Sequence, residues 1–421
     1  MHIFLDVHLL DIYQSMHPIY DIYKDSPIKF NFHVLSLCHT YTSEEHASCA
    51  YTQKLVKFME MYKNSGHKIY HYGNEGSVVP EGVEHIQILS EKERNGFGFS
   101  GVFNTATANG IRWDPNEPYW KLFGSRCSEH LTKRVQRGDL ILHVAGGYDC
   151  YQHALVNFPG CNRYGTTNAM FVDIGCGHHG VGSTDYMVYE TSVWEEHLNG
   201  QLNNDSVKWG ETAIPNYFDL KDFRFGKDPE EDDERILAIQ KESYYLFLGR
   251  IVEDKGWKIA VEATRHIRAK LVIAGQGELE LPSQVDNVIH FGFADLKQRK
   301  SLMAGAVAVF VPTQYREPFG GVNIEAQLSG VPAITSDYAG FRELVDDKYR
   351  CVTMREYIEV AKYCATLTEE ERREIQRKAQ NKYSLAAVKP LYDRYFHRLH
   401  MLWHSGFYEM REWKDLPQLR S

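Results

Sequence analysis

Short apolar runs alternate with longer segments of helical periodicity along the chain. In the first half, runs rich in Ile, Val, Leu, Phe and Tyr predict strands at 2–7, 68–73, 85–89, 139–144, 169–174 and 186–190. A helix is predicted over 45–66, with Gly66 at its end. This alternation is typical of a parallel sheet with helices on both faces.

The alternation restarts with greater regularity in the second half. Strands are predicted at 244–249, 270–275, 287–292, 307–312 and 332–336, and helices at 256–267, 296–305, 322–330 and 340–345. Apolar positions at helical spacing predict a terminal amphipathic helix over 386–406, namely Val388, Leu391, Tyr392, Tyr395, Phe396, Leu399, Leu402 and Trp403. The fold class is therefore α/β, with two doubly wound, Rossmann-like domains.

A domain boundary is predicted before the acidic segment 226–235, which contains a proline and has the composition of a linker or a helix start. We assign residues 1–217 to an N-terminal domain, to which the C-terminal helix 388–421 also belongs. Residues 218–387 form a second domain. In the first of these, residues 92–120 are rich in Gly and Asn and predict a long loop, of the kind that often serves a binding site.

Composition narrows the class of protein. A hydrophobic fraction of 43% is enough for packed cores, and a net charge of −9 disfavours a general binder of polyanions. Eight cysteines occur without a Cys-x-x-Cys pair, which favours reduced thiols. The start of the chain does not resemble a signal peptide, and no apolar run reaches about 18 residues. We expect a cytoplasmic protein, in the host cytoplasm if the chain is encoded by a virus.

Polar or flexible residues follow the predicted strands of the second half. Gly249 and Arg250 end one strand, and Lys255 follows five positions later; two cations at a strand end suit a pyrophosphate, although each is also an ordinary surface residue. Gly275 and Gly277 follow the next strand, where glycines allow a close backbone approach or make a plain turn. Phe293 follows a third strand, at a turn that either meets a nucleobase or simply starts a helix.

The segment REPFGGVNIEAQLSGVP at 316–332 carries two glutamates eight positions apart. Gly320 and Gly321 follow the Pro-Phe turn and leave amides exposed where a helix begins at Val322, which is a natural anion site. Glu325 lies one turn inside this helix and can accept hydrogen bonds from two neighbouring hydroxyls, as a ribose presents. Glu317 precedes the glycines and can do the same for a second sugar. Two solvated glutamates beside a proline turn are the alternative.

Together these features carry a family resemblance. The run over 244–346, with GRIVEDKG, IAGQG, FGF and EPFGGVNIEAQLSGVPAITSDYAGFREL, resembles the donor-binding domain of retaining GT-B glycosyltransferases, specifically glycosyltransferase family 4. The Glu-x7-Glu pair of Glu317 and Glu325 is the signature of that family. The resemblance covers about a quarter of the chain, and a weaker one covers VYETSVWEEH and AIPNYFDLKDF in the first half.

The resemblance implies a GT-B architecture, in which two domains face each other across a cleft and the C-terminal helix crosses back to the N-terminal domain. It also implies that the N-terminal domain binds the acceptor and the second domain the nucleotide-sugar donor. It implies that Arg250 and Lys255 bind the diphosphate and Glu325 the ribose. Glu317 and the amides near 319–321, including that of Phe319, would hold the donor sugar. The turn at Phe293 would meet the base.

The resemblance also implies an activity. Such enzymes transfer a sugar with retention of configuration from a nucleoside diphosphate sugar, here expected to be a UDP-sugar, to a hydroxyl of a glycan, lipid or protein. They are generally independent of metal ions, so neither a cofactor nor a metal is expected.

The first half departs from the family pattern. The family's Gly-rich loop after the first strand is replaced by DVHLLDIYQSMHP, and DDKYRCV at 346–352 has no counterpart that we can assign. His143, followed by Gly146 and Gly147, matches a histidine that the family often places after a strand of this domain. A buried structural histidine is an equal interpretation.

Several motifs suggest other functions. GFGFSG at 96–101 matches a dinucleotide fingerprint, which would indicate an oxidoreductase, but it neither follows the first strand nor opens a helix. GCGHHG at 175–180 and Asp232-Asp233 are weak metal candidates. Four basic residues at 125–138 could follow nucleic-acid phosphates and favour, as the runner-up, a virus-type glycosyltransferase acting on hydroxymethylated DNA; they are Arg126, Lys133, Arg134 and Arg137. A non-catalytic nucleotide-sugar sensor or scaffold is the alternative from another class.

Overall fold

The structure is a computed structural model of residues 1–421. It describes residues 28–46, 49–101, 111–144, 150–155, 169–177, 184, 186–201, 210–281, 283 and 285–404. The predicted strand at 2–7, the segment that replaces the Gly-rich loop, and Gly146, Gly147, His178 and His179 lie outside these residues.

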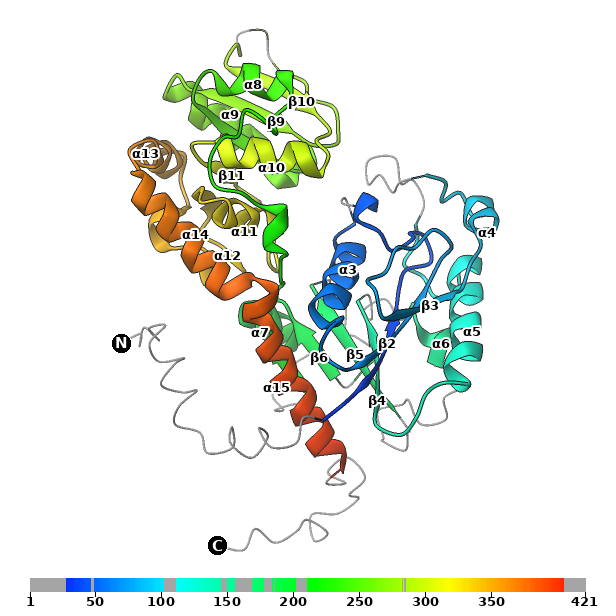
Figure 1. The fold of residues 1–421 in the computed structure, drawn as a ribbon. Helices are drawn as coiled ribbons and strands as arrows, with labels where there is room; N and C mark the ends of the chain where they lie inside the picture. The colour runs from blue at the N-terminus through cyan, green and yellow to red at the C-terminus, as the bar shows by residue number, and fades with distance from the viewer. Residues whose placement is uncertain are drawn as a thin grey trace, which may run out of the picture.

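The described part of the first half contains one parallel sheet (Figure 1). Its strands are β1 (Asn31–Leu35), β2 (Lys68–Gly73), β3 (Val83–Gln87), β4 (Asp139–His143), β5 (Ala169–Cys176), β6 (Tyr186–Tyr189) and β7 (Glu211–Ala213). They pair in the order β3-β2-β1-β4-β5-β6-β7. From β1 the chain adds strands toward one edge, and from β4 it adds them toward the other, so the order of strand addition reverses between the parallel neighbours β1 and β4. Ligands of such sheets bind at this reversal, beyond the carboxyl ends of the strands.

Two strands, the helices α6 (Gln152–Leu155) and α7 (Ser192–Gln201), and parts of two further helices in this half were not predicted. Strand β1 was missed although Phe30, Phe32 and Val34 alternate with polar residues and become buried. The short edge strand β7 was missed as well. Helix α3 (Ala50–Tyr62) starts later than predicted.

The predicted loop at 92–120 is partly helical, so that prediction is wrong in its bounds. Helix α4 (Glu91–Gly96) begins at Ser90, whose hydroxyl accepts from the amide of Glu93 while Glu93 accepts from the amide of Ser90. This reciprocal cap satisfies two amides that a helix start leaves open. Helix α5 (Pro118–Thr132) then begins at Pro118.

The second half forms a second parallel sheet, of order β10-β9-β8-β11-β12-β13. Its strands are β8 (Tyr244–Leu248), β9 (Lys270–Ala274), β10 (Val288–Gly292), β11 (Val309–Val311), β12 (Ala333–Ser336) and β13 (Arg350–Cys351). The predicted strands and helices of 244–345 are all present, with α9 (Trp257–His266), α10 (Leu296–Gly305), α11 (Gly321–Leu328) and α12 (Phe341–Leu344). Helices α8 (Glu234–Gln240), α13 (Met354–Cys364) and α14 (Glu369–Tyr383) complete this half.

The two sheets have separate hydrophobic cores, and the chain passes between them twice. One core gathers buried side chains from 30–217 together with residues of the last helix, and the other gathers side chains from 218–383. The two passages touch, because Phe218 receives and donates backbone hydrogen bonds: its amide reaches Tyr383 O at 2.9 Å, and the amide of Leu385 reaches Phe218 O at 3.1 Å. The division at 217/218 as independent folding units stays a prediction.

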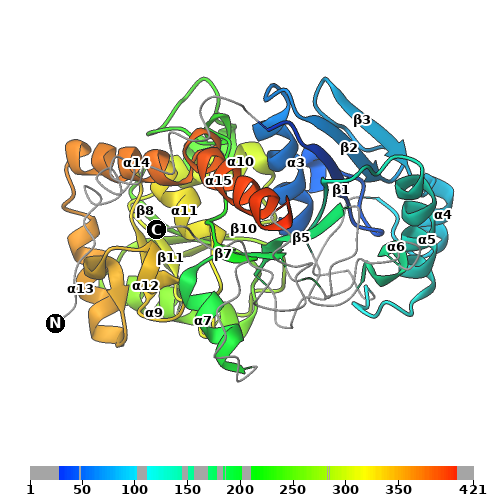
Figure 2. The same ribbon diagram turned by 90° about the horizontal axis from the view of Figure 1, so that it is seen from below.

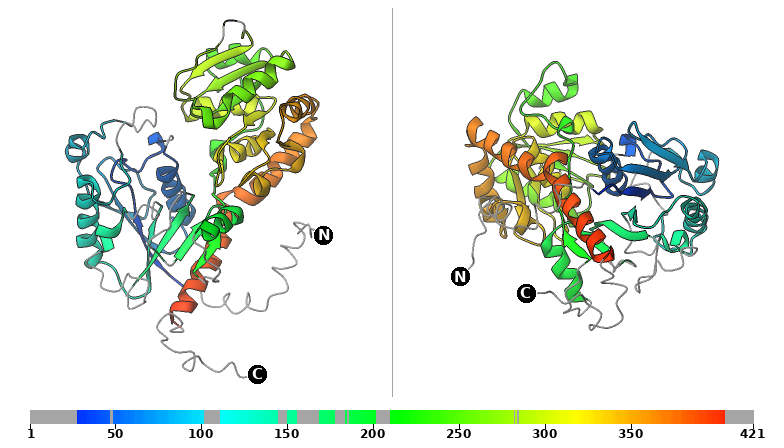
Figure 3. Two further views of the ribbon diagram at one scale, coloured as in Figure 1. Left: turned by 180° about the vertical axis from the view of Figure 1, so that it is seen from behind. Right: turned by 60° about the horizontal axis from the view of Figure 1, so that its bottom comes forward.

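Helix α15 (Leu385–His404) returns from the second sheet to the first, as expected (Figures 2 and 3). Val388, Tyr392 and Phe396 are buried in the first core, and the Tyr392 hydroxyl donates to Ile174 O at 3.3 Å. Within the described residues, no helix has both the length and the apolar character needed to cross a membrane.

Candidate functional site

The loops that follow β8 and β9 pack against each other through their backbones. The amide of Gly249 donates to Ala274 O at 3.0 Å, and the amide of Ile251 donates to Gln276 O at 2.7 Å. A Cβ on Gly275 would lie 1.7 Å from Gly249 O, so only glycine allows this approach. Packing between loops therefore already accounts for Gly275. Gly277, where a Cβ would lie 2.9 Å from Ile251 O, belongs to the same contact.

Lys255 and Glu317 lie together at this edge of the sheet. Lys255 ends the short helix η4 (Glu253–Lys255) after β8, and its Nζ lies 2.8 Å from Glu317 Oε2. The Tyr315 hydroxyl donates to the same carboxylate oxygen at 2.7 Å and also contacts Lys255 Nζ. Burial, and next the negative charge of Glu317, raise the pKa of Tyr315, so the phenol keeps its proton.

Lys255, which we expect to bind the diphosphate, and Glu317, which we expect to hold the donor sugar, thus form an ion pair with each other. The side chains of Lys255 and Glu317 are 23% and 13% exposed, so their ion pair is only partly screened by water. Tyr315 was not singled out in the sequence, although its place two residues before Glu317 puts it in the same turn.

Arg250 occupies an exposed position beside this cluster. It makes no ion pair with the described residues, but its positive charge reaches Tyr315 and opposes the rise in the pKa of that phenol. A charged guanidinium at the carboxyl end of β8 is therefore open to an anion.

The turn that contains Pro318 is fixed by contacts from both halves of the chain. Phe319 is 1% exposed, and its ring stacks on Phe218 at 6.4 Å and 21°. Gly320 has a left-handed backbone (φ 71°), and a Cβ there would lie 2.6 Å from the Phe341 ring. From the first half of the chain, the Thr191 hydroxyl donates to Pro318 O at 2.9 Å. The side chain of Phe319 thus anchors the turn, and only its backbone can face a ligand.

The amides of Gly321 and Val322 open helix α11, and Glu325 follows one turn later. Glu325 Oε2 accepts from Arg299 at 2.6 Å. Its other oxygen, Oε1, lies 4.0 Å from the place where a Cβ on Gly321 would be, so it faces the first turn of the helix. Arg299 on α10 was missed, because a basic residue in a charged helix carries no distinguishing pattern.

Phe293 lies at the same edge of the sheet. It follows β10 directly and is 56% exposed, while the neighbouring Gly292 accepts from the amide of Gly275 at 2.8 Å. The ends of β8, β9 and β10 are thus joined by backbone hydrogen bonds, and the exposed Phe293 follows the last of them.

His143 lies in the other sheet, at the end of β4. Its side chain is fully buried, with its ring 4.3 Å from Phe171 in a stacked arrangement and 5.0 Å from Tyr151. This environment agrees with the structural interpretation of His143, and a role in the site stays a prediction.

The motifs that suggested other functions lack the expected context. Gly96 of GFGFSG ends helix α4, where a dinucleotide fingerprint would follow a strand. Arg126 is paired with Glu93 at 2.6 Å, and Arg134 lies 3.5 Å from Glu84. Asp232 is held by Arg224. Among the described residues, no group of three or more His, Cys, Asp or Glu could hold a metal ion.

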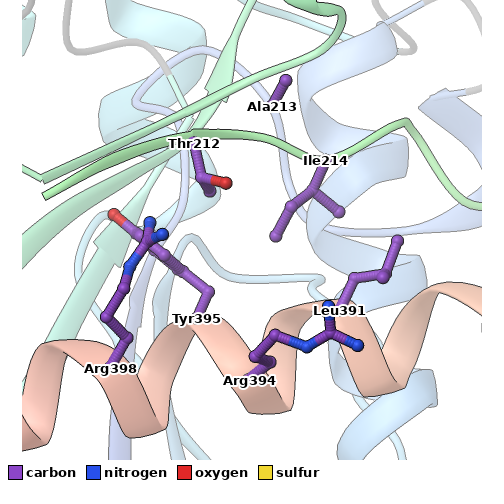
Figure 4. Close-up of a pocket in the computed structure, with 7 residues that line it drawn as sticks. All are labelled: Thr212, Ala213, Ile214, Leu391, Arg394, Tyr395 and Arg398. Atoms are coloured by element: carbon purple, nitrogen blue, oxygen red, sulfur yellow. The ribbon is translucent and has the colours of Figure 1, made fainter. Parts of the chain in front are cut away.

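A pocket lies away from the residues discussed above. It is formed between the edge strand β7 and helix α15 and includes Arg394 and Arg398 (Figure 4). Arg398 donates to Glu211 O at 2.9 Å, and the Tyr395 hydroxyl donates to Gly210 O at 2.6 Å. These contacts cover part of the sheet edge, and no predicted site residue lines the pocket.

Comparison with known proteins agrees with this architecture. An uncharacterized glycosyltransferase of Methanocaldococcus jannaschii is 33% identical over 127 residues, which cover 27% of this chain and 30% of that protein. The chain therefore matches less than a third of the length of this curated relative.

Solved structures match over most of the chain. Sucrose-phosphate synthase of Thermosynechococcus elongatus has a TM-score of 0.61 at 14% identity and covers 89% of this chain and 100% of its own. The Anabaena protein HepE, in complex with UDP-glucose, has a TM-score of 0.57 at 13% identity and covers 88% and 100%. The chain thus has the GT-B fold, and its residues 228–384 match the family of glycosyl transferases group 1.

Proposed function

We propose that the protein is a retaining glycosyltransferase that moves a sugar from a UDP-sugar to a hydroxyl of a glycan, a lipid or a protein. The observation that carries this proposal is the cluster of Arg250, Lys255 and Glu317 beside the amides that open α11. All of these groups lie within the segment that matches glycosyl transferases group 1. HepE, which shares the fold, is known in complex with UDP-glucose.

In the proposed complex, the cations Arg250 and Lys255 and the amides of Gly320, Gly321 and Val322 bind the diphosphate. Fixed cations and amides of this kind stabilise the charge of a leaving diphosphate without a metal ion. Glu325 accepts the ribose hydroxyls through Oε1, the oxygen that Arg299 leaves open. The base lies against Phe293.

Glu317 and the backbone near Phe319 hold the donor sugar. As the bond between the sugar C1 and the diphosphate oxygen breaks, a bond forms between C1 and the acceptor oxygen on the same face. The proton of the acceptor hydroxyl passes to an oxygen of the leaving diphosphate, so no separate general base is needed. The products are the nucleoside diphosphate and the glycoside.

The first test is a panel of nucleotide sugars with UDP, ADP and GDP as carriers, each measured for its effect on the melting temperature. A ligand at a hundred times its dissociation constant stabilises the folded state by about 2.7 kcal/mol. We expect UDP-sugars to raise the melting temperature the most. If none of the panel raises it, the proposal fails.

The second test separates an enzyme from a sensor or scaffold. UDP release from the preferred donor is measured with and without candidate acceptors. Release indicates turnover, whereas binding without release under all conditions favours the non-catalytic alternative. Binding to hydroxymethylated duplex DNA that weakens steeply with salt would favour the nucleic-acid alternative. The cytoplasmic location stays a prediction.

A further inference from the structure

A lysine of the N-terminal half reaches the boundary between the two halves. Lys57 lies on α3, and its Nζ is 4.8 Å from the centre of the Phe218 ring. Phe218 is the residue at which the two passages between the halves are hydrogen-bonded to each other. The ammonium group of Lys57 therefore lies over the ring that joins the halves.

The same ring leads directly to the candidate donor site. Phe218 stacks on Phe319, and its Cζ lies 4.0 Å from the place where a Cβ on Gly321 would be. Glu325 Oε1 lies at the same 4.0 Å from that place. Lys57 and the first turn of α11 therefore lie beside the same aromatic ring.

Among the charges that act on Lys57, the strongest is that of Glu325, the carboxylate that we propose binds the ribose. Burial lowers the pKa of Lys57, and Glu325 opposes this effect more strongly than any other charge; Asp222 and Asp219 act in the same direction, while Arg299 acts against them. Lys57 makes no ion pair with the described residues, so none of these carboxylates already neutralises it at contact distance. Attraction between Lys57 and Glu325 acts across the boundary.

We propose that Lys57 is a positioning residue of the donor site that the opposite domain supplies: it attracts the Glu325 carboxylate and fixes the place at which the ribose hydroxyls bind. The inference rests on the proposed function. It gives the N-terminal domain a part in binding the nucleoside, in addition to the acceptor. Because Lys57 and Glu325 belong to different domains, nucleoside binding also becomes coupled to the relative position of the domains.

The test compares nucleotide affinities of five full-length variants by calorimetry, with UDP and with uridine as ligands. Lys57→Met removes the charge and keeps most of the length, and Lys57→Arg restores the charge. Lys63→Met is the matched control, because Lys63 follows the same helix and pairs with Glu60 at its surface. Glu325→Gln, alone and combined with Lys57→Met, shows whether the two residues act together.

We expect Lys57→Met to weaken the affinity for both ligands by about five- to tenfold, in line with a charge pair that is only partly screened. Lys57→Arg and Lys63→Met should stay within about twofold of the wild type. In the Glu325→Gln background, Lys57→Met should have no further effect, because the carboxylate on which it acts is gone.

Three results would overturn the inference: equal affinities of the wild type and Lys57→Met, effects that multiply in the double variant, or a loss confined to UDP, which would mean that Lys57 contacts the phosphates. A purely structural role would lower the melting temperature of Lys57→Met and leave the affinity of the folded protein unchanged, and this also contradicts it. A wild-type protein that binds no nucleoside diphosphate would overturn the proposed function itself.

Discussion

Because Lys255 and Glu317 form an ion pair, replacing Lys255 should change UDP affinity in two ways. Lys255→Met removes a cation that we expect to contact the diphosphate. It also leaves the Glu317 carboxylate, 2.8 Å from the lost ammonium, without its partner at the place where the diphosphate has to bind. The variant therefore loses an attraction and gains a repulsion.

The size of the effect follows from the kind of contact. A hydrogen bond to a charged group contributes about 1.5–3 kcal/mol, which corresponds to a loss of about ten- to a hundredfold or slightly more in UDP affinity. Replacing the carboxylate as well, in Lys255→Met/Glu317→Gln, removes the repulsion. If the repulsion costs about 1 kcal/mol, its removal corresponds to a fivefold gain in affinity. We therefore expect the double variant to bind UDP at least about fivefold more tightly than the single variant does.

The assay is calorimetry with UDP, which lacks the sugar and so leaves out the proposed contact of Glu317 with the donor. Lys258→Met is the matched control: Lys258 is three residues away, and its ion pair with Glu253 is well exposed to solvent. This control should bind UDP like the wild type. Unchanged affinity in Lys255→Met would contradict a diphosphate contact of Lys255, and weaker binding by the double variant than by the single one would contradict the repulsion by Glu317.

Three further predictions address the site and the fold. Tyr315→Phe removes the hydroxyl that bridges Lys255 and Glu317, and it should lower kcat/KM for donor turnover by about fivefold, with a smaller effect on UDP affinity; equal losses in both would contradict a bridging role. Gly275→Ala introduces a Cβ 1.7 Å from Gly249 O and should destabilise the fold by about 3 kcal/mol or more, measured by urea unfolding; a wild-type midpoint would show that the loops can separate at little cost. His71 is buried between Thr42 and His85, and burial lowers its pKa to about 3. The unfolded chain binds its proton near the ordinary pKa of 6.5, so the stability that the neutral ring contributes is present above pH 6.5 and is lost as the pH falls toward 3. His71→Gln should reduce the fall in melting temperature between pH 6.5 and 4, and an unchanged slope would rule out this group.

The second sheet and its loops were predictable because the local sequence patterns there match the elements and the burial that the structure shows. Between 244 and 345, each strand is a short apolar run and each helix has a cap or a glycine at its boundary, such as Asp295 at the start of α10. From the sequence alone, a glycine after a strand could serve either a ligand or the packing of the chain. The structure shows that Gly275 allows two loops to touch, which does not require a ligand.

In the first half, strand β1 was missed because it carries a buried polar residue. His33 is enclosed between Tyr72 and Asp139, at 2.7 and 3.0 Å. It interrupts the continuous apolar run that would have predicted a buried strand. Pairing partners far apart in the sequence satisfy this polar residue, and that information does not exist in any local window.

The partners of the site residues were out of reach for the same reason. Glu317 and Glu325 were found from their spacing, whereas Arg299, Thr191 and Lys57 lie on other elements and carry no motif. Each becomes visible only through a contact: Arg299 with Glu325, Thr191 with Pro318, and Lys57 with Phe218.

A crystal structure of the protein with UDP would show directly which groups hold the diphosphate. We expect the diphosphate to lie between Arg250, Lys255 and the amides of Gly321 and Val322, with the ribose hydroxyls on Glu325. UDP bound elsewhere, or a diphosphate that contacts none of these groups, would contradict this expectation.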